Sequence, residues 1–130
     1  MFNDIFNQKE VIITGNSGFK GSWLSLWLKN IGAKVHGISY HPPSDPNMFE
    51  ALKIENKIDS FHQLDIAENY FEVNKIVSNI NPDFVFHLAA QSLVKRSYKD
   101  PIFTWDTNAL GTRNILECLR ILKKKLVDKF

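Results

Sequence analysis

Residues 14–21 constrain the fold of this chain more than any other segment. Glycines at positions 15, 18 and 21 lie between a β-branched run at residues 10–14 and a helical pattern that continues to about residue 30. In a strand–turn–helix unit, such glycines permit a tight turn, a close approach of main-chain N–H groups to a phosphate, and close packing of helix on strand. The helix N-terminus adds unpaired N–H donors. The pattern therefore predicts a βαβ unit that binds a dinucleotide pyrophosphate, and the alternative is a glycine-rich turn with a structural role only.

Short β-branched runs alternate with helical patterns along the rest of the chain, which is typical of βαβ units around a parallel sheet. We predict strands at residues 10–14, 34–40, 60–64 and 84–87, and helices at residues 19–30, 47–57, 67–79 and from Pro101 to about residue 122 or beyond. Right-handed crossovers place the first strand centrally, with the second on one side and the fourth on the other. The predicted fold class is α/β: a Rossmann-type doubly wound parallel sheet, truncated after about four strands and the helix that follows strand four.

Two of these helices have apolar residues at helical spacing, which predicts a buried stripe on each. The first stripe comprises Phe19, Trp23, Leu24, Trp27, Leu28 and Ile31, and the second comprises Tyr70, Val73, Ile76, Val77 and Ile80. Gly32 is expected to end the first of these helices as a C-cap glycine. Cys118 lies among apolar helical residues and is expected to be a small core side chain.

Two further segments lie at the carboxyl edge of the predicted sheet, where a dinucleotide rests in doubly wound folds. Asp65 can accept a hydrogen bond from the adenine amino group, and Ile66 beside it offers apolar contact. The same carboxylate fits a capping box with Glu68 for the next helix, and the two roles can coexist. His87 ends the fourth strand, and the small residues among 88–91 leave room for a ribose or nicotinamide. A lone histidine at a strand end is more often a hydrogen-bonded structural residue than a catalyst.

Composition excludes several classes of function. Sixteen basic and fourteen acidic residues leave a formal charge of +2, too balanced to favour nucleic acid or a membrane as a partner. The single cysteine permits no intrachain disulfide and predicts a reduced compartment. No secretory signal and no apolar run of about 20 residues is present, and the scattered histidines predict no metal site. We therefore expect a soluble, cytoplasmic protein.

These segments together resemble the extended short-chain dehydrogenase/reductase superfamily and, more specifically, its CDP-glucose 4,6-dehydratases. The shared motifs are GFKGSW at residues 18–23, HLAAQSLVKRSY at residues 87–98 and TNALGT at residues 107–112, and the resemblance extends from about residue 9 to residue 120. It implies a lyase that holds NAD tightly and acts on a nucleotide-linked glucose. In that family hydride leaves C4, water is lost across C5 and C6, and hydride returns to C6. The product would be CDP-4-dehydro-6-deoxyglucose, for the deoxysugars of surface polysaccharides.

The resemblance also implies site residues. Those expected around the cofactor are Gly15, Asn16, Ser17, Gly18, Phe19, Lys20 and Gly21 at the pyrophosphate, Asp65 and Ile66 at the adenine, Leu88, Ala89, Ala90 and Gln91 at the nicotinamide ribose, and Thr107. Ser92, Arg96 and Ser97 are substrate-side candidates for contacts with sugar or phosphate. Asn108 is expected to tie its helix to the fourth strand. The full-length enzyme is expected to be a homo-oligomer.

One departure from the family pattern concerns the choice of cofactor. An acidic residue at the end of the second strand often holds the ribose 2′-OH and selects NAD. Tyr40 and His41 occupy that place here, and a neutral or protonated histidine can tolerate a 2′-phosphate. NAD is therefore expected from the resemblance, and NADP stays open.

A second departure concerns catalysis. The family's catalytic pair is a tyrosine four residues before a lysine, but the residues four after the three tyrosines, Tyr40, Tyr70 and Tyr98, are Ser44, Asn74 and Ile102. Without that pair no acid–base step at the 4-hydroxyl is available. We therefore expect no catalytic residue in residues 1–130, which would form the NAD(P)-binding N-terminal part of an enzyme and be inactive alone. The alternatives are another nucleotide-sugar epimerase or dehydratase of the superfamily and a non-catalytic NAD(P)-sensing module.

Overall fold

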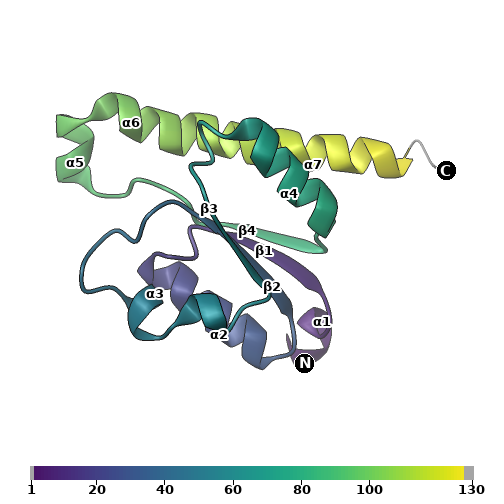
Figure 1. The fold of residues 1–130 in the computed structure, drawn as a ribbon. Helices are drawn as coiled ribbons and strands as arrows, with labels where there is room; N and C mark the ends of the chain where they lie inside the picture. Colours follow the sequence, from purple (N-terminus) through teal and green to yellow (C-terminus); the bar gives the residue numbers. More distant parts are fainter. Residues whose placement is uncertain (1, 128–130) are drawn as a thin grey trace. The chain divides into compact units, whose positions relative to one another are not determined.

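The computed structural model describes residues 2–127 of the chain, which divides into two compact units, Met1–Leu64 with Pro82–Ala89, and Asp65–Asn81 with Ala90–Phe130. The first unit contains, in chain order, α1 (Phe2–Phe6), β1 (Glu10–Thr14), α2 (Phe19–Asn30), β2 (Lys34–Ser39), α3 (Met48–Ala51), the 3₁₀ turn η1 (Ile54–Asn56), β3 (Ser60–Gln63) and β4 (Phe84–His87) (Figure 1). The second contains α4 (Tyr70–Ile80), α5 (Val94–Lys99), α6 (Pro101–Trp105), the π-helical turn η2 (Asp106–Leu110) and α7 (Gly111–Val127).

The sheet of the first unit has four strands in the order β3-β2-β1-β4, and all three strand pairs are parallel. β1 is central, and its residues Val11, Ile12 and Ile13 have no exposed surface. Such continuous apolar runs are typical of strands buried on both faces. The predicted strand order and the Rossmann-type α/β fold class are confirmed, and β2 and β3 each end one residue before the predicted bound.

Helix α2 contacts β1 and β2, and its predicted stripe is confirmed at Leu28, which is buried, but half of the stripe is exposed. Phe19, Trp23 and Trp27 are 66%, 54% and 53% exposed, so the prediction is wrong at these positions. Leu24 and Ile31 are half-buried and pack against the core. The residues of α2 that are buried are Gly21, Ser22, Ser25 and Leu28.

Close contact between main chains explains which face of α2 is buried. A Cβ on Gly21 would lie 2.2 Å from the carbonyl oxygen of Gly15. The hydroxyl of Ser22 donates to the carbonyl of Asn16 (3.1 Å), and that of Ser25 donates to the carbonyl of Gly21 (2.8 Å). A small residue is required where the first turn of this face meets the elbow, and the large rings of Phe19, Trp23 and Trp27 lie on the exposed side of the helix. Gly32, at a φ of +88°, follows the helix as predicted.

The segment predicted as one helix over residues 47–57 is instead two short pieces, α3 and η1. The Asn47 side chain begins α3 by accepting the N–H of Glu50 (2.9 Å). Lys53 then adopts a left-handed conformation, with a φ of 51°, which a continuous helix does not allow. The break therefore separates the two pieces.

Helix α4 begins at Tyr70, three residues after the predicted start. The Asp65 carboxylate accepts the N–H of Ala67 (2.8 Å), and the N–H of Asn69 donates to the Asp65 carbonyl (3.0 Å). This is an Asx turn, and the predicted capping box with Glu68 is wrong. The turn uses the residues that were expected to form the first helical turn.

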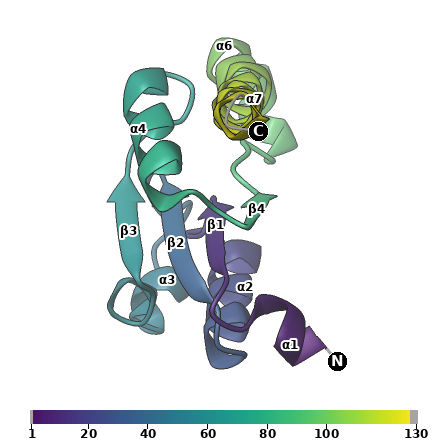
Figure 2. The ribbon, with the colours of Figure 1, turned by 90° about the vertical axis from the view of Figure 1, so that its right-hand side faces the viewer.

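The second unit is built on α4 and α7, which lie side by side (Figure 2). The predicted stripe of α4 is confirmed at Val73, Ile76 and Val77, which are buried. Ile115 and Cys118 of α7 are also buried, as expected for Cys118. Burial raises the pKa of the Cys118 thiol to about 11, so this cysteine is an inert core side chain.

Two features of the second unit have no counterpart in the sequence prediction. Residues 94–99 form α5, and the Asp100 carboxylate after it accepts the N–H of Phe103 and so caps α6 (3.0 Å). The helix that begins at Pro101, as predicted, contains the π-helical turn η2, in which one turn holds an additional residue. Across residues 2–127, no helix combines the length and apolar character that a membrane crossing requires.

The corrected orientation of α2 can be tested with two adjacent residues. Leu28→Ala should lower the free energy of unfolding by about 2–5 kcal/mol, because it leaves a cavity in the core; Leu28 is 1% exposed. Trp27→Gln should lower it by less than about 1 kcal/mol, because Trp27 is 53% exposed. Urea denaturation followed by circular dichroism measures both. Equal losses for the two variants would contradict this orientation.

Candidate functional site

The turn between β1 and α2, residues 15–18, is called the elbow below. Gly15 has a φ of +72°, a conformation that favours glycine. A Cβ on Gly15 would lie 2.6 Å from the main-chain nitrogen of Ala89, and the Gly15 N–H donates to the carbonyl of Ile38 (2.8 Å). The elbow is therefore fixed, through main-chain atoms, at the carboxyl ends of β1, β2 and β4.

The three glycines of the motif differ in what a side chain would meet. At Gly15 and Gly21 a Cβ would overlap main-chain atoms of the protein itself, at 2.6 Å and 2.2 Å. At Gly18 the only close atom is the carbonyl oxygen of Gly15, at 3.3 Å, and the backbone is extended, with φ −76° and ψ 169°. The fold therefore requires glycine at positions 15 and 21, whereas at position 18 a Cβ would make one tight main-chain contact without overlap.

Gly18 is also the N-cap of α2, and no side chain caps this helix. The first N–H groups of a helix have no acceptor within the helix. Here the intrahelical bonding begins with the N–H of Ser22, which donates to the Gly18 carbonyl (2.9 Å). The N-terminus of α2 thus presents main-chain donors and the positive end of the helix dipole beside an uncapped glycine.

Asn16 supplies a second, independent observation at the elbow. Its side chain has no exposed surface, yet neither its Oδ1 nor its Nδ2 has a hydrogen-bond partner among the described residues. A Cβ on Gly37 in β2 would lie 2.2 Å from this Nδ2, so the amide lies against the strand. Buried polar groups in proteins are rarely left unpaired, and this one lies in the segment predicted to bind an anion.

Ser17 and Ser39 connect the elbow to the end of β2. Their hydroxyl oxygens are 2.7 Å apart, and the N–H of Ser17 donates to Ser39 Oγ (3.2 Å). Both side chains are buried. The elbow and the residues that follow β2 therefore keep a fixed relation within the first unit.

The end of β4 is held by the hydroxyl of Thr14. This oxygen accepts the N–H groups of Leu88 and Ala89 (3.2 Å each) and lies 2.7 Å from His87 Nδ1. Because its lone pairs are used, the hydroxyl donates to Nδ1, and a neutral His87 carries its proton on Nε2. Burial lowers the pKa of His87 and favours that neutral form. His87 is thus hydrogen-bonded, as expected for a histidine at a strand end, and its structural role stays a prediction.

The residues predicted near the adenine belong to the second unit. One oxygen of the Asp65 carboxylate, Oδ1, is used by the Asx turn, and Ile66 is 3% exposed. Asn114 of α7 donates from its Nδ2 to the carbonyls of Ile66 and Ala67 (2.8 and 3.0 Å). A Cβ on Gly111 would lie 2.8 Å from the Ile66 side chain. The segment that follows β3 is thus fixed to α7.

Gln91 and Asn108 form a reciprocal main-chain clamp in the second unit. The Gln91 N–H donates to Asn108 Oδ1 (2.8 Å), and Asn108 Nδ2 donates to the Gln91 carbonyl (3.0 Å). Asn108 therefore ties its helix to a residue beyond the fourth strand, not to the strand itself. The side chain of Gln91 is buried and hydrogen-bonded to Leu93 and Thr104. Its contact with the nicotinamide ribose stays a prediction. Thr107, in η2, has a buried hydroxyl without a partner among the described residues.

The substrate-side candidates lie in the second unit, at and before α5. The Ser97 hydroxyl donates to the carbonyl of Val94 (2.6 Å). The guanidinium of Arg96 lies 4.3 Å from the ring centre of Phe103, a cation–π contact. Ser92 is exposed. Their contact with a sugar stays a prediction.

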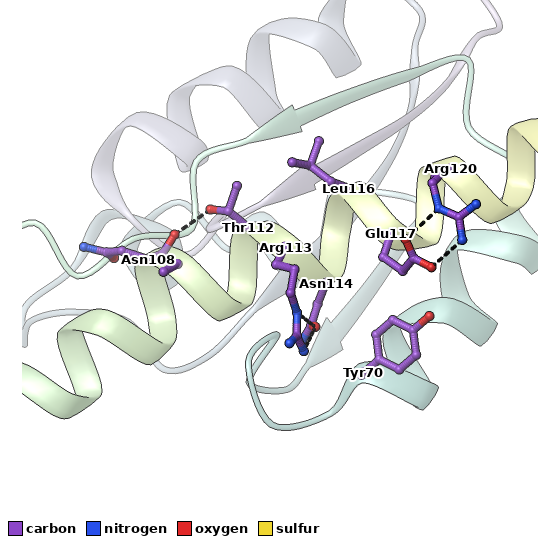
Figure 3. Close-up of a pocket in the computed structure, with 9 residues that line it drawn as sticks. Tyr70, Asn108, Thr112, Arg113, Asn114, Leu116, Glu117 and Arg120 are labelled. Carbon is purple, nitrogen blue, oxygen red and sulfur yellow. Dashed lines mark hydrogen bonds and ion pairs between the residues drawn. The ribbon is translucent and has the colours of Figure 1, made fainter.

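A hollow of about 720 Å³ on the second unit does not coincide with the predicted site (Figure 3). Its lining residues come from α4, η2 and α7: Tyr70, Asn108, Ala109, Thr112, Arg113, Asn114, Leu116, Glu117 and Arg120. None of them is a predicted cofactor or substrate residue. Glu117 accepts two hydrogen bonds from Arg120 (2.7 Å each), which lower the pKa of its carboxyl.

The structure thus brings Gly15–Gly21, Leu88 and Ala89 together in the first unit, whereas Asp65, Ile66, Ala90, Gln91 and Thr107 belong to the second. Sequence analysis missed the residues that support the elbow, Thr14, Gly37 and Ser39. A glycine inside a strand signals a close approach of another group, so Gly37 offered a usable signal, but Thr14 and Ser39 did not. No cluster of metal-ligating side chains occurs within residues 2–127.

The fold and the elbow define a Rossmann-type α/β protein. A family model described as GDP-mannose 4,6 dehydratase matches residues 12–130. The chain therefore belongs to this family of nucleotide-sugar 4,6-dehydratases, and the resemblance found in the sequence is confirmed.

Individual relatives agree with the family. The chain is 42% identical over 112 residues to a CDP-glucose 4,6-dehydratase of Salmonella typhimurium, covering 86% of this chain and 31% of that protein. It is 31% identical over 128 residues to a GDP-mannose 4,6-dehydratase of Vibrio cholerae, covering 95% of this chain and 34% of that protein. The chain thus spans about a third of the length of these curated relatives.

Solved structures show the same fold. A UDP-glucose 4-epimerase of Thermus thermophilus, in complex with NAD, matches with a TM-score of 0.71 and 28% identity. The match covers 87% of this chain and 34% of that one.

The lowered pKa of His87 predicts how the free energy of unfolding depends on pH. Because the pKa of His87 is lowered in the fold, the unfolded chain binds this proton more readily than the folded chain does. The neutral ring therefore contributes to the free energy of unfolding above the ordinary pKa of 6.5. This contribution is lost as pH falls through the lowered pKa. His87→Asn should therefore reduce the loss of unfolding free energy between about pH 7 and about pH 5. Urea denaturation at several pH values measures this loss. An identical pH slope in wild type and variant would count against it.

Proposed function

We propose that the elbow binds the pyrophosphate of NAD. The observation that carries this proposal is the glycine at position 18, where a Cβ would overlap no main-chain atom and would approach the Gly15 carbonyl oxygen at 3.3 Å. This glycine is the N-cap of a 12-residue helix that no side chain caps, the arrangement that binds phosphate groups through main-chain N–H donors. The unpaired buried amide of Asn16 in the same turn is consistent with a polar group that joins the site on binding.

The remaining predicted cofactor contacts are kept as part of this proposal. Asp65 has a second carboxylate oxygen that its Asx turn does not use, and this oxygen can accept from the adenine amino group. Leu88 and Ala89 follow β4 with main-chain atoms close to Gly15, where a ribose meets little side-chain bulk. NAD is the cofactor named in the Thermus thermophilus epimerase complex, and it would supply hydride transfer to and from a sugar.

For the whole enzyme we propose conversion of CDP-glucose to CDP-4-dehydro-6-deoxyglucose, with this chain as its cofactor-binding portion. The 42% identity to a CDP-glucose 4,6-dehydratase makes CDP-glucose the first candidate, and identities of 40% and 31% to two GDP-mannose 4,6-dehydratases make GDP-mannose the second. The 130-residue chain, which holds no Tyr-x-x-x-Lys pair, is proposed to bind cofactor without turnover. A cytoplasmic location and a homo-oligomeric full-length enzyme are part of the same proposal.

Substitution at Gly18 tests cofactor binding. Gly18→Val should weaken NAD binding at least about tenfold, because it obstructs charge-assisted hydrogen bonds from the main chain, each worth about 1.5–3 kcal/mol. Isothermal titration calorimetry with NAD, NADP and ADP-ribose measures this. Trp23→Val, one turn further along α2 at a 54% exposed position, is the control and should bind as wild type does. No calorimetric signal from the wild type, or an unchanged affinity in Gly18→Val, would overturn the proposal.

The substrate is tested with a longer form of the protein that extends through a Tyr-x-x-x-Lys segment. We expect it to convert CDP-glucose in preference to GDP-mannose and dTDP-glucose, with loss of one water detected by mass spectrometry. The 130-residue chain should give no product with any of the three. Turnover of a non-CDP sugar only would reject CDP-glucose, and NAD binding without turnover by the longer form would favour a sensing module.

A further inference from the structure

Asn114 of α7 has a buried amide that makes every hydrogen bond available to it. The residue is 1% exposed. Its Nδ2 donates to the carbonyls of Ile66 (2.8 Å) and Ala67 (3.0 Å). Its Oδ1 accepts from Nη2 (2.9 Å) and Nε (3.3 Å) of Arg113 (Figure 3). An asparagine amide has two N–H donors and one oxygen with two lone pairs, so no donor or acceptor of this side chain is left for a ligand.

The neighbours of Asn114 also determine which way its amide faces. A guanidinium only donates and a main-chain carbonyl only accepts, so an exchange of Oδ1 and Nδ2 would break all four hydrogen bonds. The donor to Oδ1 is the exposed Arg113. The amide is therefore held in one orientation, and with it residues 66 and 67 are held against α7 within the second unit.

The same segment orients the carboxylate of Asp65. The N–H of Ala67 donates to Asp65 Oδ1 (2.8 Å), while the carbonyl of Ala67 accepts from Asn114. Asn69 adds two hydrogen bonds to the Asp65 carbonyl, from its N–H and from its Nδ2 (3.0 Å each). Oδ1 is thus fixed by main-chain atoms that Asn114 holds, and Oδ2 is the carboxylate oxygen that the Asx turn does not use.

Gly111, three residues before Asn114 on α7, supports the same arrangement by a different contact. A Cβ on Gly111 would lie 2.8 Å from Cδ1 and 2.9 Å from Cγ1 of Ile66. Ile66 is 3% exposed, so its side chain packs against the helix where a side chain at position 111 is missing. The segment is therefore held on α7 both by packing and by its carbonyls.

We propose that Asn114 is a positioning residue for the adenine of the cofactor. It holds Ala67, and through Ala67 the Asp65 carboxylate, so that Oδ2 accepts the adenine amino group. The inference rests on the proposed binding of NAD and on the proposed contact of Asp65 with adenine. Because Asn114 acts through Asp65, it affects how well adenine is distinguished from a purine without the amino group.

The experiment compares, by calorimetry on the 130-residue chain, the affinity for NAD with that for an NAD analogue in which hydrogen replaces the adenine amino group. The wild type should bind NAD at least about tenfold more tightly than the analogue, as expected for one hydrogen bond to a charged acceptor. Asn114→Ala should reduce this ratio to about threefold or less, because the carboxylate is no longer held in place. Leu116→Ala, at a 62% exposed position of α7, is the control and should keep the wild-type ratio.

A double variant tests whether Asn114 acts through Asp65. Asp65→Asn puts an N–H where Oδ2 accepts, so it should also abolish the preference for NAD. Adding Asn114→Ala to Asp65→Asn should lower the ratio no further, because two residues that act on one contact are not additive. A further fall of the ratio in the double variant would contradict the inference.

A role of Asn114 in folding alone gives a different result. Asn114→Ala would then weaken NAD and the analogue by the same factor, and an unchanged ratio would overturn the inference. If circular dichroism shows that Asn114→Ala does not fold, Arg113→Met decides instead. It removes the donors to Asn114 Oδ1 at an exposed position and should lower the ratio about twofold or more, whereas a wild-type ratio would reject the proposal.

The wild type alone separates this inference from the proposed function. If it binds NAD and the analogue equally well, the adenine contact and the role of Asn114 are both wrong, while NAD binding stands. If it binds neither, the proposed function fails and the inference fails with it.

Discussion

The first unit depends on the contact between the first turn of α2 and the main chain of the elbow. Gly21 lies so close to the Gly15 carbonyl that a Cβ would overlap it, and this contact determines the rest of the helix. Small residues, Ser22 and Ser25, continue the buried face and satisfy their hydroxyls on nearby carbonyls. The aromatic residues of α2 are turned outward as a consequence, and the uncapped N–H groups of the helix lie at the carboxyl edge of the sheet.

The sequence predicted those parts of the fold that follow from one local pattern. Runs such as Val11–Ile13 identify a buried strand, and the rule on crossover handedness then gives the strand order. On α2 periodicity was wrong for Phe19, Trp23 and Trp27, which are exposed, and right for Leu28, which is buried, because it assumes that every apolar residue lies on the buried face. Here the close approach of α2 to the main chain of the elbow determines which face is buried. The spacing of the small residues Gly21 and Ser25 is the sequence pattern that indicates this face. The start of α4 was misplaced for a similar reason, since the side chain of Asp65 bonds to its own turn.

The residues of the candidate site also differ in whether a single segment of sequence predicts them. The glycine motif and the histidine at the end of β4 are read from single segments, and both are found where they were expected. The elbow is held by residues distant in sequence, such as Ser39, whose hydroxyl is hydrogen-bonded to that of Ser17. No single segment of the sequence predicts such a pair. The family match adds that the chain belongs to the nucleotide-sugar 4,6-dehydratases, and Gly18 and Asn16 are the residues that point to a ligand at this turn.

The π-helical turn η2 has a consequence for the second unit. One surplus residue in a helical turn offsets the azimuth of everything that follows by about 100°, the rotation of one residue at 3.6 per turn. Asn108, within this turn, reaches Gln91, and Asn114, beyond it, reaches the carbonyls of Ile66 and Ala67. The helical segment from η2 to α7 therefore holds two loops of the second unit, one through a residue inside the π-helical turn and one through a residue beyond it.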